Sequence, residues 1–248
     1  MFTNRYIFIY SSVMVIIVAA LLSTAAMLLK PYQDKNIAIA KMQGILSAAE
    51  ITATAEDAIS LYDKNITEEL VINPKGEIIS IYKNKEFVKG DKRAFDVDIK
   101  KQLYKKSQGE AFDIPLYKAE IDGNLIYIVP LLGKGLWGPI YGNIAFGADF
   151  NKIVGATFGN DKETPGLGAE ISFKQFWDQF IGKTIFTDDG KFTSIDVVKG
   201  GVSVLPAADR IHGVDAISGG TITSNGVTDM IRNCLENYVA FIKENIDK

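Results

Sequence analysis

Hydroxyl and glycine residues are concentrated in one stretch near the carboxyl end of the chain. Residues 215–226 read Asp-Ala-Ile-Ser-Gly-Gly-Thr-Ile-Thr-Ser-Asn-Gly, and an apolar helical pattern follows directly. A phosphate would suit this place, because unpaired N–H groups and the positive end of the dipole collect where a helix begins. A plain helix cap by Ser224 or Asn225 fits equally well. The hydroxyl residues of the stretch are Ser218, Thr221, Thr223 and Ser224.

Two further loops combine glycine with apolar or turn-forming residues. Residues 133–142 read Gly-Lys-Gly-Leu-Trp-Gly-Pro-Ile-Tyr-Gly, in which Leu136 and Trp137 offer apolar surface to a ligand. Residues 163–168 read Glu-Thr-Pro-Gly-Leu-Gly, and Pro165-Gly166 predicts a type II turn. Free N–H groups in that turn could donate to carbonyl oxygens or ring nitrogens of a ligand. Each loop also fits an ordinary structural turn, so neither identifies a ligand alone.

Composition excludes several other kinds of chemistry. The 248 residues include one cysteine and one histidine. These counts exclude an internal disulfide, a Cys-x-x-Cys redox pair, a multi-histidine metal centre and a self-contained iron–sulfur cluster. The 27 basic and 30 acidic residues give a net charge of −3, which does not fit a nucleic-acid-binding protein. We therefore predict that the chain has neither a metal site nor a catalytic residue. If the protein transfers electrons, we expect it to use an organic cofactor.

The amino-terminal stretch has the length and composition of a membrane anchor. Residues 6–29 contain no charged side chain and are bounded by Arg5 and Lys30. As a helix the stretch would be roughly 36 Å long, enough to cross a hydrocarbon core of about 30 Å. A cleaved signal peptide is the alternative, although its apolar region is usually only about 7–15 residues long. We therefore predict a transmembrane anchor at 1–30 and an extramembrane domain at 31–248.

The remaining chain alternates between strand and helix signals, which predicts an α+β domain with a mixed or antiparallel sheet and flanking helices. Lys83 to Lys106 is rich in charge and is predicted to form a solvated loop with a short helix. The predicted strands are residues 70–73, 78–82, 114–121, 125–132, 140–146, 153–158 and 193–198. Helices are predicted over 36–50, where Gly44 weakens the pattern, over 173–181 and over 227–242. In 173–181 the face expected in the core is Phe173, Phe176, Trp177, Phe180 and Ile181.

The three loops, taken in this order behind one apolar segment, resemble the FMN-binding-domain family. The resemblance is densest from Leu132 to Val227 and includes His212-Gly213-Val214-Asp215 before the hydroxyl-rich stretch. It implies a covalent FMN, attached by a phosphoester to the last threonine of a Ser-Gly-Ala-Thr motif, which is Thr221 here. The chain departs from that motif with Gly220 in place of alanine, a smaller residue that should still allow attachment. Thr223 is the rival acceptor.

The resemblance also implies roles for the surrounding residues. Leu136, Trp137 and Leu167 would flank the flavin ring, and the backbone at Thr164 and Gly166 would contact its polar edge. Ser218 and Thr223 would lie near the phosphate, together with Gly219 and Gly220. Asp215 would belong to the sequence that a separate flavin transferase reads. His212 has no assigned role, and Cys234 is expected to be packed rather than reactive.

Within the family, the motifs are more similar to the flavin subunit of sodium-exporting NADH:quinone oxidoreductases than to that of ferredoxin:NAD+ oxidoreductases, which stays the alternative. The implied function is electron relay within an oxidoreductase complex of the bacterial inner membrane, without a complete active site in this chain. Partner subunits would hold the NADH and quinone sites and the sodium pathway. The domain would lie on the periplasmic side. A flavin-free, membrane-tethered assembly module is an alternative of another class.

Overall fold

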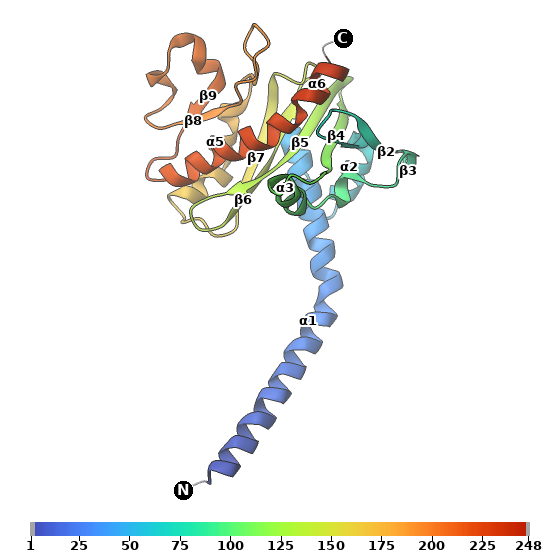
Figure 1. Ribbon diagram of the computed structural model, residues 1–248, viewed down its shortest axis with the longest axis vertical. Coiled ribbons are helices and arrows are strands. Elements are labelled where there is room, and N and C mark those ends of the chain that lie inside the picture. The colour runs from blue at the N-terminus through green and yellow to red at the C-terminus, as the bar shows by residue number, and fades with distance from the viewer. Residues whose placement is uncertain (1–2, 247–248) are drawn as a thin grey trace. The chain divides into compact units, whose positions relative to one another are not determined.

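The computed structural model describes residues 3–246, and Figure 1 shows their helices and strands. The α+β class predicted from the sequence is confirmed. The helices are α1 (Asn4–Ala48), α2 (Ala58–Asn65), α3 (Ile99–Ser107), α4 (Lys174–Trp177), α5 (Thr221–Leu235) and α6 (Val239–Asn245). The strands are β1 (Ile66–Ile72), β2 (Ile78–Lys83), β3 (Glu86–Lys89), β4 (Ile114–Ile121), β5 (Asn124–Lys134), β6 (Pro139–Phe146), β7 (Ile153–Asn160), β8 (Asp196–Val198) and β9 (Gly213–Asp215).

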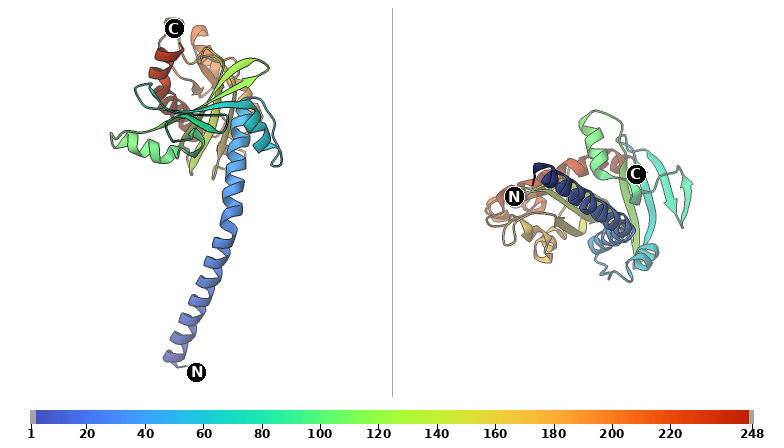
Figure 2. Two further views of the ribbon diagram at one scale, coloured as in Figure 1. Left: turned by 90° about the vertical axis from the view of Figure 1, so that its right-hand side faces the viewer. Right: turned by 90° about the horizontal axis from the view of Figure 1, so that it is seen from below.

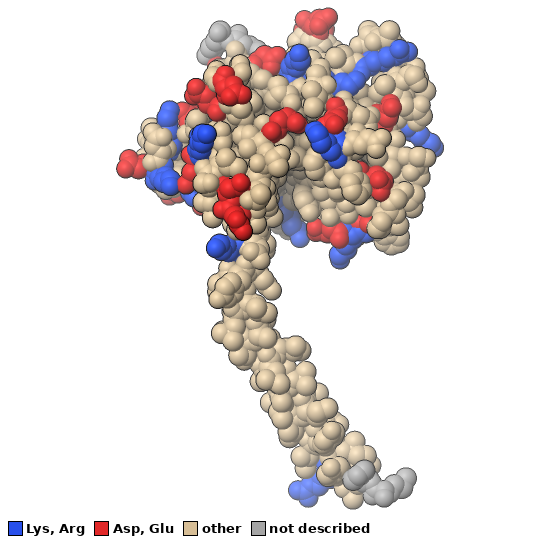
Figure 3. All heavy atoms as spheres, turned by 180° about the vertical axis from the view of Figure 1, so that it is seen from behind, with Lys and Arg blue, Asp and Glu red and all other residues tan. Residues whose placement is uncertain are grey.

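Helix α1 contains the apolar stretch and continues beyond it. Among the described residues it is the one helix long and apolar enough to cross a membrane. Its visible surface in Figure 3 carries no charged residue along the apolar stretch. Pro31 lies inside the helix, and the helix predicted over 36–50 belongs to the same element. The chain divides into two compact units between Met42 and Gln43.

Seven strands form one sheet in the order β3-β2-β1-β4-β5-β6-β7, and every neighbouring pair is antiparallel. Both predicted hairpins are present, as β1–β2 and β4–β5. The charge-rich segment was predicted as loop and short helix, and α3 supplies the helix. It also contains the edge strand β3, which the prediction missed because all four of its residues are exposed and show no apolar alternation.

Both faces of the sheet are covered, so its central strands are buried on each side. On one face, side chains such as Leu70 and Leu131 pack with the carboxyl-terminal helices in the main core. The red helices α5 and α6 lie beside the strands in Figure 1 and in the left view of Figure 2. On the other face, Val71 and Ile128 are fully buried, as is Leu46 from the last turns of α1. Thr157 of β7 donates from its hydroxyl to the carbonyl oxygen of Gly44 at 3.2 Å.

An aromatic cluster anchors the turn between β6 and β7. The Phe150 ring stacks on Phe146 with centroids 5.0 Å apart and lies 4.9 Å from the Tyr127 ring. Tyr238 and Phe241, beyond α5, approach the same ring at 6.1 and 6.2 Å. Phe150 has φ of 48°, an unfavourable backbone conformation for a bulky residue. Its complete burial among four other rings compensates for that conformation.

Three segments differ from their predicted form. The helix predicted over 173–181 ends at Trp177 and continues as a 3-10 turn over 178–180. Phe176 and Phe180 are buried as expected, but the core prediction was wrong for Phe173 and Ile181, which are exposed at the two ends.

The strand predicted over 193–198 is shortened to β8, which pairs in parallel with β9. Ser194, with φ of 67°, interrupts the extended conformation before β8 begins. The terminal helix predicted over 227–242 begins earlier, at Thr221, and a 3-10 turn over 236–238 divides it into α5 and α6.

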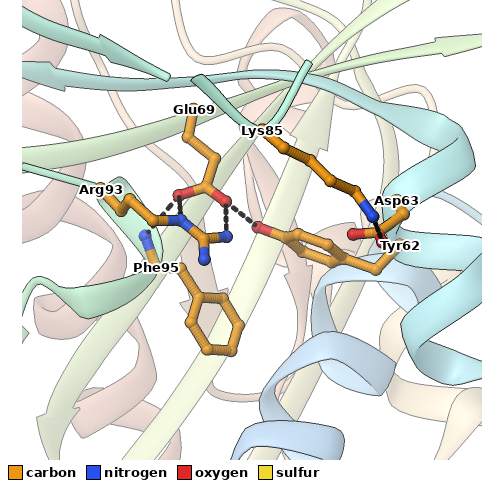
Figure 4. Close-up of polar contacts among 6 residues, drawn as sticks. All are labelled: Tyr62, Asp63, Glu69, Lys85, Arg93 and Phe95. Carbon is orange, nitrogen blue, oxygen red and sulfur yellow. Dashed lines mark hydrogen bonds and ion pairs between the residues drawn. The ribbon is translucent and has the colours of Figure 1, made fainter. Parts of the chain in front are cut away.

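A buried ion pair fastens the segment before α3 to the sheet (Figure 4). Glu69 of β1 is 3% exposed, and its carboxylate accepts hydrogen bonds from the Arg93 guanidinium. It also accepts from the Phe95 backbone N–H at 3.0 Å and the Tyr62 hydroxyl at 3.1 Å. Burial and the nearby charge of Glu69 raise the pKa of Tyr62, so this hydroxyl keeps its proton and donates.

We predict that Arg93→Ala destabilises the domain by about 3–5 kcal/mol, the range for leaving a buried charge without its partner. Lys85→Ala removes the more exposed ion pair with Asp63, also drawn in Figure 4, and should cost much less, because solvent screens that pair. Denaturant unfolding of the full chain in detergent measures both values. Equal losses in the two variants would show that Glu69 does not depend on Arg93.

Candidate functional site

A cavity of about 220 Å³ lies where three separate segments meet. The first segment is the loop after β5, the second follows β7, and the third is the amino-terminal end of α5. The cavity therefore joins the three loops that sequence analysis singled out. Its lining residues are Leu136, Trp137, Glu163, Thr164, Leu167, Gly168, Gly219, Gly220, Thr221, Ile222 and Thr223.

The β5–β6 hairpin presents the apolar residues of the first loop. Its last paired residues are Lys134 and Pro139, and the Gly135 N–H donates to the Gly138 carbonyl at 2.8 Å to close the tip. Leu136 and Trp137 lie at this tip, where Trp137 is 63% exposed. Exposed apolar side chains at the rim of a cavity suit a flat aromatic ligand, which would cover them.

The second loop forms the turn that Pro165-Gly166 predicts. The Leu167 N–H donates to the Thr164 carbonyl at 3.1 Å, and Gly166 has φ of 76°, which the third position of a type II turn requires. Thr164 and Leu167 line the cavity. Gly166 is not among the lining residues, and its N–H donates to Glu170 Oε1 at 2.9 Å.

Helix α5 begins directly at the cavity. Thr221 is its first residue, and the helical hydrogen bond from the Ser224 N–H to the Gly220 carbonyl is 2.9 Å long. Within residues 3–246, the N–H groups of Thr221, Ile222 and Thr223 have no hydrogen-bond partner. Three free donors and the positive end of a 15-residue helix make this a place for an anion such as phosphate.

Of the two alternatives that the sequence left open here, a cap by Ser224 or Asn225 does not occur in the structure. Gly220 precedes the first helical residue, and no side chain caps the end. Ser224 lies in the first turn, where its buried hydroxyl accepts a hydrogen bond from the Ile217 N–H at 3.1 Å. Ser224 therefore connects the preceding turn to the helix. The first three N–H groups of α5 stay free at the cavity.

Glu163 is a site residue to which sequence reasoning gave no role. Its side chain is 6% exposed and lines the cavity. Oε1 accepts from the Trp137 backbone N–H at 2.8 Å, and Oε2 accepts from the Thr223 hydroxyl at 2.6 Å. The sequence marks Glu163 as the start of a turn motif, but its burial depends on two segments distant in the chain.

The segments that build the cavity lie in a region shared with known proteins. Residues 135–236 match the family model of the FMN-binding domain. The NqrC subunit of the Na(+)-translocating NADH-quinone reductase from Haemophilus ducreyi is 31% identical over 223 residues, which cover 88% of this chain and 84% of that protein. The chain belongs to the NqrC family of reductase subunits.

Solved structures of NqrC proteins have the same fold. The crystal structure from Parabacteroides distasonis is 38% identical, with a TM-score of 0.72 over 86% of this chain and 96% of that one. The structure of NqrC from Shewanella oneidensis is 28% identical, with a TM-score of 0.65 over 83% and 96% of the two chains. The resemblance drawn from the three loops is therefore confirmed. The relatives are subunits of an oxidoreductase complex, as that resemblance implies.

Besides Gly166, two residues that the NqrC-like motifs predict for the site, Ser218 and Asp215, do not line the cavity. Ser218 is exposed in the turn before Gly219. Asp215 lies on β9, where its Oδ1 accepts from the Val202 N–H at 2.7 Å and its own N–H donates to Gln179 Oε1 at 2.8 Å. Asp215 as a whole is exposed.

The lone histidine and cysteine are both engaged in local structure. His212 Nδ1 lies 2.6 Å from the Thr184 carbonyl oxygen, which ties two loop segments together. Cys234 is buried on α5, and burial raises the pKa of its thiol to about 11. Its Sγ lies 3.6 Å from the Leu132 carbonyl oxygen. A buried, protonated thiol is unreactive at neutral pH, which agrees with the expectation that it is packed.

We predict that Gly168→Ala disrupts the base of the cavity. A Cβ atom there would lie 2.4 Å from Thr223 Oγ1 and 2.5 Å from Glu163 Oε2, so the two side chains would have to separate. Such overpacking should lower the free energy of unfolding by about 1–3 kcal/mol. Gly138→Ala is the matched control at the hairpin tip, since its nearest contact would be 3.4 Å. Denaturant unfolding that does not distinguish the variants would contradict this packing.

Proposed function

We propose that this chain is the electron-relay subunit of a Na+-translocating NADH:quinone reductase and carries FMN through a phosphoester to Thr221. Membership of the NqrC family and the match to the FMN-binding domain support this function. The position of Thr221 is the observation that supports this attachment site. Thr221 is the first residue of α5, it is half-buried, and it lines the cavity.

Thr221 is a better acceptor than Thr223 for a physical reason. The Thr223 hydroxyl is 2% exposed and donates to Glu163, so it is neither accessible nor free. The Thr221 hydroxyl has no hydrogen-bond partner within residues 3–246. Thr221 also lines the cavity, so a flavin that enters the cavity can reach this hydroxyl. Among residues 3–246 no carboxylate or histidine is hydrogen-bonded to the Thr221 hydroxyl, so we propose that a flavin transferase makes the bond.

The residues of the cavity fit the parts of FMN. The free N–H groups of residues 221–223 would bind the phosphate, with the helix dipole favouring its negative charge. Leu136, Trp137 and Leu167 supply the apolar surface for the ring system, and Thr164 contributes polar atoms at its edge. When bound, FMN supplies the redox chemistry, because it accepts and releases electrons at that ring.

The chain's own contribution is to position the cofactor. A cavity of about 220 Å³ is small for a ligand site, so a ring held there keeps part of its surface open to a neighbouring protein. Partner subunits would provide the sites for NADH and quinone and the sodium pathway. With the flavin in this chain and the other sites in partner subunits, the chain would pass electrons between redox centres.

The amino-terminal helix would hold the relay at the membrane. We infer a retained anchor of the bacterial inner membrane, with residues 31–248 on the periplasmic side. The length of the uncharged stretch at 6–29 supports retention, because the apolar region of a signal peptide is usually only about 7–15 residues long.

Intact-mass measurement tests the attachment. Protein produced together with a flavin transferase should carry one FMN-sized adduct, which Thr221→Ala abolishes and Thr223→Val retains. Protein produced without the transferase is the control for enzyme-dependent transfer. An adduct that persists in Thr221→Ala would overturn the assignment of the site. Wild-type protein that stays unmodified beside the transferase would overturn the relay function and favour the flavin-free assembly module.

Cysteine labelling tests the orientation. Native Cys234 is buried and protonated, so the wild-type chain should react little with a membrane-impermeant maleimide. Ser203→Cys places a thiol at an exposed position of the extramembrane domain. We expect rapid labelling of this variant in spheroplasts. Labelling that requires lysis of the spheroplasts would place the domain in the cytoplasm instead.

A further inference from the structure

Glu163 combines burial with a negative charge in the wall of the cavity. Each of its two carboxylate oxygens has one donor, the Trp137 N–H on Oε1 and the Thr223 hydroxyl on Oε2. Both donors are neutral, so neither supplies a counter-charge. Burying a carboxylate against neutral partners costs free energy, which indicates that the position has a use for the group.

The two hydrogen bonds join all three segments of the cavity. Trp137 belongs to the β5–β6 hairpin, Glu163 follows β7, and Thr223 lies in the first turn of α5. Glu163 is itself held in place, because its N–H donates to Asn160 Oδ1 at 2.9 Å at the end of β7. The carboxylate therefore fixes the hairpin tip and the helix start relative to one point on the sheet.

Hydrogen bonding alone does not require a carboxylate at this position. A glutamine of the same shape could accept from the Trp137 N–H through its oxygen and donate to the Thr223 hydroxyl through its amide nitrogen. What glutamine lacks is the charge. Because Glu163 lines a cavity of about 220 Å³, a ring bound there would lie near this charge, and burial weakens the screening by water.

We propose that Glu163 is a positioning and tuning residue of the cofactor site. Its two hydrogen bonds hold the hairpin tip against the start of α5, and its charge lowers the reduction potential of the bound flavin. A fixed negative charge disfavours the addition of electrons to a neighbouring group, so the oxidised form is stabilised. The tuning part rests on the proposed function, whereas the positioning part concerns the protein alone.

Redox titration of the flavin-loaded full chain tests the tuning. Glu163→Gln should raise the ratio of reduced to oxidised flavin at a fixed potential about tenfold, equivalent to about 30 mV for a two-electron couple. Glu170→Gln is the matched control. Glu170 lies in the same segment and also accepts one backbone hydrogen bond, from Gly166, but it does not line the cavity. Glu170→Gln should shift the ratio less than threefold.

Equal shifts in Glu163→Gln and Glu170→Gln, or no shift in either, would overturn the tuning role. Intact mass is measured first on each sample. A missing adduct on the wild-type chain counts against the proposed function, and a normal adduct with an unchanged potential counts against the role of Glu163.

Amide hydrogen exchange of the flavin-free full chain tests the positioning. Glu163→Ala removes the acceptor of the Trp137 N–H, so this amide should exchange at least tenfold faster, while Glu163→Gln keeps most of the protection. Amides of the β1–β2 hairpin, which is remote in the sheet order, report whether the domain remains folded. Unchanged exchange at Trp137 in Glu163→Ala would overturn the positioning role. So would equal acceleration of Trp137 in both variants.

Discussion

The close packing of α5 along β5 is the contact on which the site depends. Gly226 of α5 lies so near the strand that an added Cβ would be 2.4 Å from the Lys134 carbonyl oxygen. Only glycine allows this approach. Since Lys134 is the last residue of β5 and Thr221 lies five residues before Gly226, the contact sets the helix start beside the tip of the β5–β6 hairpin. The cavity forms in the space between them.

The cavity separates two kinds of surface that a bound cofactor needs. Its rim is apolar and exposed, with Leu136 at 46% and Trp137 at 63% exposure. Its base is polar and buried. There the Thr223 hydroxyl donates a hydrogen bond to Glu163, and this bond connects the surrounding loops. The free N–H groups of α5 lie beside both. In the proposed function, a ring would cover the rim and a phosphate would use the free donors. The hydrogen bond between Thr223 and Glu163 occupies neither place.

Contacts away from the cavity hold the sheet and its flanking segments together. The seven-stranded sheet is covered on both faces, and the ring cluster around Phe150 ties the β6–β7 turn to the segment beyond α5. The ion pair of Glu69 with Arg93 fastens the segment before α3. None of these contacts reaches the cavity. They hold β5, β6 and β7, whose ends carry the loops, in a fixed order.

The sequence alone determined the elements whose signals are local. The uncharged stretch at 6–29, the two hairpins and the amphipathic pattern of α5 follow from runs and periods of neighbouring residues. The three loop motifs also identified the family. Local signals were insufficient where exposure hides the pattern, as in β3, and where a backbone angle interrupts it, as at Ser194.

Tertiary structure decided which of the candidate residues meet. It placed Leu136, Trp137, Leu167 and Thr221 around one cavity, and it placed Asp215 and Ser218 outside its lining. It also gave a physical difference between the two threonines that the motif had ranked, because Thr223, unlike Thr221, reaches a buried acceptor. That acceptor, Glu163, is 60 residues away along the chain. Burial and hydrogen bonding between such distant residues depend on how sheet and helix pack, and no run of neighbouring residues encodes them.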